Sequence, residues 1–167
     1  MKLSRLAWLI SLILIALLAG CTSSEQKVSL DEIWNHTTAS LNKVSACQYH
    51  EYIKVSSGKE AWIKGEYDFS SKNERIIKID GDNISMSLSK IFDLIQKSKN
   101  KELIGEEEIR LVKKRSCWVV KVTSNNSEMK IWIDKESYLP IRIKFEETDK
   151  NQNLSMQRAI DLFDYKT

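Results

Sequence analysis

Two spacings of apolar residues follow one another along this chain, a helical spacing first and a strand-like spacing after it. Just past Ser29, apolar residues recur with a period of about 3.6, as in an amphipathic helix: Leu30, Ile33, Trp34, Leu41 and Val44. Ser29 and Glu32 stand in the positions of a capping box, in which the Ser29 hydroxyl accepts a hydrogen bond from the Glu32 amide. The sequence therefore predicts a helix from Ser29 onward that lies on another element.

From Ala46 the period falls to about 2, which is typical of strands with one buried face. The predicted strands lie, in chain order, in residues 49–55, 61–69, 75–80, 83–88, 103–115, 117–124, 127–135, 139–147 and 154–165. The first two are joined by Ser56-Ser57-Gly58-Lys59 and the next two by Gly81-Asp82, both of which favour hairpin turns. Ile141, Ile143 and Phe145 alternate with charged residues, so one face of the sheet meets a core and the other meets water.

A second helix interrupts the strands. Leu88, Ile91, Phe92 and Ile95 return to helical spacing before a polar run that ends at Glu102. A single antiparallel meander with one apolar face needs a cover, and the two amphipathic helices are the only segments that offer one. We therefore predict an α+β fold: a curved antiparallel sheet covered by one longer N-terminal helix and one short internal helix.

The chain begins with a leader typical of exported proteins. Lys2 and Arg5 precede an apolar run that ends at Ala19, which spans only ~20 Å as a helix against the ~30 Å hydrocarbon core of a bilayer. Leu18-Ala19-Gly20-Cys21 then resembles the lipobox of prokaryotic lipoproteins, which implies a diacylglyceryl group on the Cys21 thiol. We expect a signal peptide over 1–20, a lipidated tether over 21–28 and one domain over 29–167. A plain secretory signal with a chance cysteine is the alternative.

Charge and motifs argue against several functions. Without Lys2 and Arg5 the chain has 24 basic and 23 acidic residues, a formal charge of +1, which gives no basis for nucleic-acid binding. His36 and His50 have no metal-ligand pattern beside them, and the sequence has neither a phosphate-binding glycine loop nor a nucleophile elbow. We therefore expect no enzyme activity, no metal and no cofactor.

Assigning Cys21 to a lipid leaves two further cysteines, Cys47 and Cys117. Outside the cytoplasm such a pair can form a disulfide, because no reducing thiol pool protects it. Two buried free thiols are the alternative. The sequence does not decide between them, since a disulfide needs the two Cα atoms within about 7 Å.

Several segments resemble the LolA/LppX/LprG-type superfamily of lipoprotein-sorting and lipid-carrier proteins. They are residues 39–49 at the junction of helix and first strand, 105–108 with 116–122 in a later hairpin, 131–143 with an aromatic-Ile-Asp turn and a Pro-led return strand, and 163–165 in the closing strand. The resemblance implies an open half-barrel whose helices cap an apolar cavity for an acyl chain or another hydrophobic group. Because this chain has its own predicted anchor, a tethered binder, receiver or sensor on the outer face of a membrane fits it better than a shuttle.

The inward faces of the predicted strands and helices supply the candidates for lining such a cavity: Ile53, Ile63, Phe92, Trp118, Ile131, Ile143 and Phe145. Trp62 and Trp132 share their strand faces with charged residues and are expected to point outward. The expected partners are the membrane, through the lipid, and a lipid or acyl ligand. A packed envelope interaction or assembly module without a ligand is the alternative function.

Overall fold

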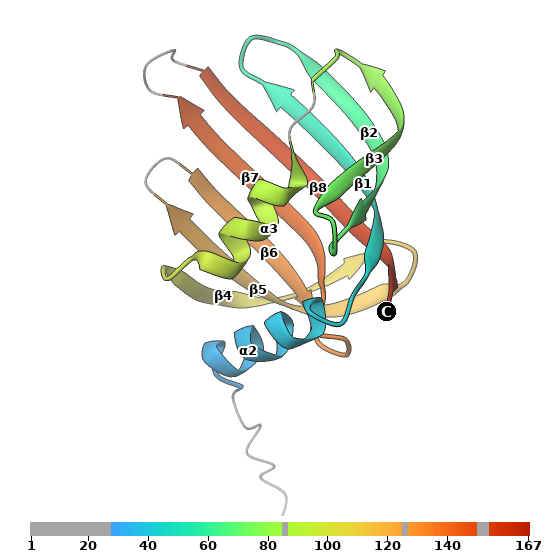
Figure 1. Cartoon of the computed structure of the whole chain (residues 1–167). Helices are drawn as coiled ribbons and strands as arrows, with labels where there is room; N and C mark the ends of the chain where they lie inside the picture. Colours follow the sequence, from blue (N-terminus) through green and yellow to red (C-terminus); the bar gives the residue numbers. More distant parts are fainter. Residues whose placement is uncertain (1–27, 85–86, 125–126, 150–153) are drawn as a thin grey trace, which may run out of the picture.

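The computed structural model describes residues 28–84, 87–124, 127–149 and 154–167, which form one sheet covered by two helices (Figure 1). The helices are α2, Leu30–Leu41, and α3, Leu88–Lys97. The strands are β1 Ala46–Val55, β2 Glu60–Asp68, β3 Asn73–Gly81, β4 Lys101–Arg110, β5 Lys114–Ser124, β6 Ser127–Asp134, β7 Pro140–Asp149 and β8 Leu154–Lys166. The predicted signal peptide, Cys21 and all of the predicted tether except Val28 lie outside the described residues.

The sheet is antiparallel throughout, in the order β3-β2-β1-β8-β7-β6-β5-β4. The pairing of β1 with β8 joins the early hairpin strands to the later ones in the middle of the sheet. Register shifts at Lys64/Gly65, Leu103/Gly105 and Trp132/Ile133 add bends to the strands, as bulges do. The sheet curves without closing, with β3 and β4 as its edges. The predicted α+β fold with a curved sheet and two covering helices is confirmed.

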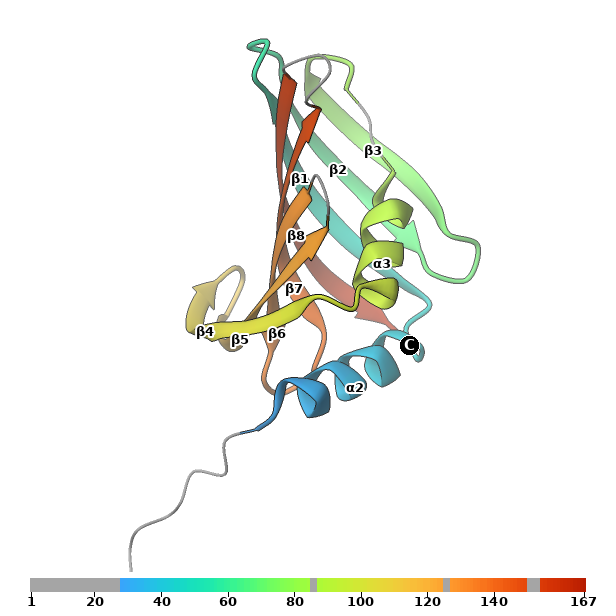
Figure 2. The same cartoon turned by 90° about the vertical axis from the view of Figure 1, so that its left-hand side faces the viewer.

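The two helices lie where their apolar stripes require. The Ser29 hydroxyl accepts a hydrogen bond from the Glu32 amide at 3.2 Å, so the predicted cap of α2 is formed. Ser87 caps α3 in the same way, through the Ser89 amide at 3.2 Å. Figures 1 and 2 show α3 lying across the concave face of the sheet and α2 crossing its lower end.

One apolar cluster fills the space between the concave face and the helices. Both helices contribute to it, as do six of the eight strands; the exceptions are the edge strands β3 and β4. A smaller cluster lies on the opposite face and consists of Ile109, Cys117, Val119, Trp132 and Ile141. It forms because the end of the sheet made by β4 and β5 curls back, so that Ile109 of β4 covers part of the outer face.

Two predicted element boundaries are wrong. Of the predicted strand 83–88, residues 85 and 86 lie outside the described residues, and the others do not pair with β3. The Asp82 carboxylate lies 2.9 Å from the Glu60 nitrogen and accepts its hydrogen bond, which turns the chain away from the sheet, and Leu88 begins α3. The predicted strand 103–115 contains most of β4, a turn at 111–113 and the start of β5, and the predicted break at Ser116 lies inside β5. That turn contains none of the Gly, Pro, Asn or Asp residues that usually mark one.

Candidate functional site

The seven residues predicted to line a cavity are all buried in the concave cluster, with exposed fractions of 6% or less. They come from six different elements, and the curvature of the sheet brings them together beneath α2 and α3. The residues therefore form one apolar surface. The cluster is packed rather than open, because the apolar side of α3 lies directly in it through Leu88, Ile91, Phe92 and Ile95. Whether these residues contact a ligand stays a prediction.

A polar bridge fixes α3 on the concave face. Glu74 of β3 accepts a hydrogen bond from the Leu88 amide at the first residue of α3, where a negative charge also interacts favourably with the helix dipole. The Tyr49 hydroxyl donates to the same carboxylate at 3.4 Å. Tyr49 itself lies flat against Gly65, where an added Cβ would come within 2.5 Å of the ring. Gly65 is thus the position that lets Tyr49 reach β3 and hold the carboxylate that anchors α3.

A hollow of about 250 Å³ opens at the other end of α3, between the helix and strands β5 and β6. Its apolar lining residues belong to the concave cluster or pack against it: Leu94, Val122 and Met129. Its polar lining residues are Lys97, Ser98, Lys99, Asn100, Thr123 and Ser127. The hollow is therefore amphipathic, with an apolar floor that continues into the core and a polar rim.

Further lysines extend this rim along β4 and β5. A neighbouring hollow of about 350 Å³ shares Lys99, Asn100 and Thr123 with the first and adds Lys101, Glu102 and Lys121. The Lys101 ammonium lies 4.4 Å from the centre of the Trp34 ring, and burial lowers the pKa of Lys101. Sequence reasoning missed this group because the run from Lys97 to Lys101 looks like an ordinary solvated surface; its position directly after an amphipathic helix was the available signal.

A buried ion pair lies on the concave side, where β1 meets β8. Glu51 and Arg158 are each 3% exposed or less and form a direct ion pair and hydrogen bond. Burial raises the pKa of Glu51, and the Arg158 guanidinium opposes this shift. Glu51 stands at an inward position in the alternation of β1, between Tyr49 and Ile53, so a polar residue in an apolar series was the sequence signal for it.

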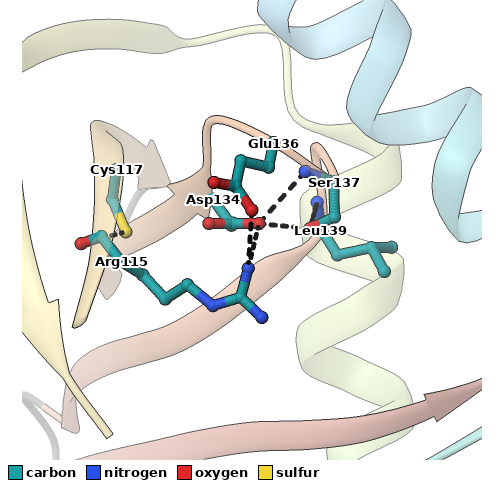
Figure 3. Close-up of polar contacts among 6 residues, drawn as sticks. All are labelled: Arg115, Cys117, Asp134, Glu136, Ser137 and Leu139. Atoms are coloured by element: carbon teal, nitrogen blue, oxygen red, sulfur yellow. Dashed lines mark hydrogen bonds and ion pairs between the residues drawn. The ribbon is translucent and has the colours of Figure 1, made fainter. Parts of the chain in front are cut away.

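A second polar group organises the turn between β6 and β7 (Figure 3). One oxygen of Asp134 accepts from the Ser137 amide at 3.0 Å and the Ser137 hydroxyl at 2.6 Å, and lies 3.5 Å from the Arg115 guanidinium. Arg115 also pairs with the exposed Glu136 at 3.1 Å. The other Asp134 oxygen is buried and has no hydrogen-bond partner among the described residues. The turn places Tyr138 against His36 of α2, at 4.7 Å between ring centres.

The predicted disulfide between Cys47 and Cys117 is not formed, and both thiols are free and buried. Cys47 lies in the concave cluster and Cys117 in the cluster on the outer face. Their strands, β1 and β5, are separated by three others, so at about 4.8 Å per step they are roughly 19 Å apart along the sheet. This exceeds the reach of a disulfide. Burial raises the pKa of Cys47 to about 12 and that of Cys117 to about 11.

The two tryptophans expected to point outward differ. Trp62 is 60% exposed and packs beside Tyr52, with 4.4 Å between ring centres and an angle of 35° between the ring planes, so that prediction is confirmed. Trp132 also lies on the outer face, but Ile109 packs beside it and it is only 5% exposed. Its indole donates a hydrogen bond to Glu107 of β4 at 2.8 Å. The curl of β4 over this face accounts for the difference.

Within the described ranges, no three His, Cys, Asp or Glu side chains gather where they could hold a metal ion. None of the helices in the same ranges has the length and apolar character needed to cross a bilayer.

Several solved structures share features of this arrangement. The lipoprotein LppX from Mycobacterium tuberculosis matches at a TM-score of 0.45 and 10% identity, over 83% of this chain and 97% of LppX. MucB in complex with MucA matches at 0.42 and 14% over 83% of this chain, which spans 57% of MucB. A LolA superfamily protein from Nitrosomonas europaea matches at 0.34 and 9%, over 83% of this chain and 93% of that protein. No family model and no curated protein matches the sequence.

At such scores and identities the similarity concerns the path of the chain and says nothing about ligands or partners.

Proposed function

We propose that this protein is a lipoprotein, anchored through Cys21 on the outer face of a membrane, that binds a lipid or another hydrophobic ligand between its sheet and helices. It acts as a binding protein and not as an enzyme. The lipobox supports the anchor. The concave apolar cluster, with one end open beside α3, supports the ligand.

The observation that carries the proposal is the amphipathic hollow at the end of α3. An apolar floor continuous with the core suits an acyl chain, and the lysine rim suits an acidic headgroup. At about 250 Å³ the hollow is smaller than the roughly 300–1,000 Å³ typical of ligand pockets. The hollow therefore receives one end of the ligand. The rest of the ligand's acyl chain inserts between α3 and the sheet as the helix moves outward.

The alternative of a packed envelope module is favoured by one specific observation. The concave cluster is filled by its own side chains, and both helices rest directly on it. A protein of this kind would take up no ligand, and its exposed surfaces would carry its function.

Native mass spectrometry separates the two candidates. A form with residues 22–167 keeps both clusters, since all of their residues lie after residue 27, and it lacks the acylated cysteine. We expect this form to carry co-purified lipid, or to take up a fluorescent fatty acid after delipidation. A protein that emerges without lipid and takes up no fatty acid would contradict the binding proposal and support the packed module.

The location of the ligand is tested by filling the hollow. Thr123 is exposed and lines the rim, so Thr123→Trp places a large ring there without changing the core. We expect it to reduce fatty-acid uptake at least tenfold. Thr148→Trp is the matched control, because Thr148 is an exposed strand residue on β7 that lines none of the hollows described above; it should leave uptake unchanged.

The anchor is tested separately in cells. Labelled palmitate should be incorporated into the full chain and not into Cys21→Ser. Incorporation into both, or into neither, would contradict the assignment of Cys21.

A further inference from the structure

The turn between β4 and β5 combines exposed apolar and basic side chains. Its sequence, from the end of β4 into β5, is Arg110-Leu111-Val112-Lys113-Lys114-Arg115. Val112 is 86% exposed, a larger fraction than that of any other large hydrophobic residue exposed in the described ranges. Isolated exposed apolar residues are common on proteins, but this one stands between four cations on a projecting turn.

Two of these cations form no ion pair among the described residues. Lys114 is bound to Glu108 at 2.6 Å, and Arg115 to Glu136 at 3.1 Å. Arg110 and Lys113, which flank Leu111 and Val112, make no ion pair within 4.0 Å in the part of the chain that the structure describes. The tip therefore offers two positive charges without an ion-pair partner on either side of the exposed Val112, while Leu111 packs against the cluster on the outer face. A surface that is acidic and has apolar material just beneath it complements this arrangement.

We propose that the β4–β5 turn, residues 110–115, is a second membrane contact, which rests on the headgroups of an anionic bilayer with Val112 inserted between them. Basic residues near an anionic surface are attracted to it, and adjacent apolar side chains enter the headgroup region. In both views the turn projects at one side of the molecule, in the half that is nearer to α2 (Figures 1 and 2). The described chain also begins in this half, just before α2.

The assignment of a bilayer as the partner of this surface depends on the proposed lipid anchor. A tether from Cys21 to Val28 spans at most ~27 Å when extended, which keeps Val28, just before α2, within that distance of the membrane. Tethering raises the effective concentration of the surface, so a contact that is weak by itself is sufficient. Such a contact would orient the domain and fix the direction in which the hollow beside α3 faces.

Vesicle co-sedimentation tests this contact without the acyl anchor. The form with residues 22–167 should bind vesicles of phosphatidylglycerol and phosphatidylcholine, bind pure phosphatidylcholine far less, and dissociate as salt rises. Arg110→Gln/Lys113→Gln should weaken binding to the anionic vesicles by about 25-fold, from about fivefold for each basic residue. Adding Val112→Ser should weaken binding to the anionic vesicles further, without changing how that binding depends on salt.

The matched control removes the same charge elsewhere. Lys54 and Lys59 are exposed at the β1–β2 turn, at the opposite end of the molecule from α2 (Figure 1), and Lys54→Gln/Lys59→Gln should bind almost as the parent does. An equal loss in the two double variants would show an effect of net charge and overturn the proposal. Equal binding of the parent to both vesicle types would also overturn it, and would leave the acyl anchor and the ligand site unaffected, since neither is used in this assay.

Discussion

At the scale of single residues, the two buried thiols make the stability of the protein depend on pH. Burial raises the pKa of Cys47 from 9.0 to about 12, so the native state keeps this proton while the unfolded state loses it. Stability from this group is therefore complete below about pH 9 and falls as the pH rises toward 12. We expect Cys47→Ala to have a free energy of unfolding that declines less steeply above pH 9, by up to about 1 kcal/mol per pH unit.

The comparison uses slopes, because Cys47→Ala also removes buried volume and lowers stability at every pH. Tyr49, whose pKa burial also raises, remains in both proteins, so its contribution cancels. Urea unfolding at pH 8, 9 and 10 provides the measurement. Parallel declines in the two proteins would show that the Cys47 thiol ionises normally in the native state.

The same scale shows what the sequence could predict about the site. Alternation and helical spacing identified seven buried residues correctly, because inward or outward direction is a local property of a strand or helix. Whether Cys47 pairs with Cys117 was left open by the sequence, since it depends on strand order, which no local pattern encodes. The Glu51–Arg158 pair was missed for the same reason: 107 positions separate the partners in sequence.

At the scale of elements, the turn between β6 and β7 depends on one carboxylate. Asp134 holds the Ser137 amide and hydroxyl, and the turn presses Tyr138 against α2. Asp134→Ala would leave these donors without their acceptor in a partly buried site, so we expect a loss of about 1–3 kcal/mol in the free energy of unfolding. Amide hydrogen exchange in α2 should accelerate more than in α3.

Glu136→Ala is the control for this prediction. Glu136 is the other ion-pair partner of Arg115, and its side chain is 85% exposed. Its effect on unfolding should be below about 1 kcal/mol, as for surface ion pairs. Similar losses in the two variants would show that Asp134 contributes through Arg115 and not through the turn.

Element boundaries were predictable where turn chemistry was present. Gly58 marks the break between β1 and β2 correctly, whereas the turn at 111–113 has no such residue and was not predicted. The break predicted at Asn125-Asn126 lies outside the described residues. Gly81-Asp82 misled in the opposite direction. There the carboxylate of Asp82 accepts a hydrogen bond from the Glu60 amide at the start of β2. This contact ends β3, and no hairpin turn into a following strand forms.

At the scale of the whole molecule, the junction of β1 with β8 holds the two parts of the sheet together, and the Glu51–Arg158 pair is buried at that junction. A buried charge without its partner is strongly unfavourable, whereas a pair replaced by apolar side chains is often tolerated. We therefore expect Arg158→Met to lower the free energy of unfolding by about 3–5 kcal/mol. Glu51→Leu/Arg158→Met should recover most of that loss.

The outer face supplies the comparison for this pair. Arg142 binds Asp161 at 2.6 Å between β7 and β8, with about 30% of each side chain exposed, so Arg142→Met should lower stability by only about 1 kcal/mol because water replaces the lost partner. A double-mutant cycle measured by urea unfolding gives the coupling energy within each pair. If the coupling of Glu51 with Arg158 were no larger than that of Arg142 with Asp161, burial would not be what makes the inner pair important. The junction of the sheet would then depend on its backbone ladder and apolar contacts alone.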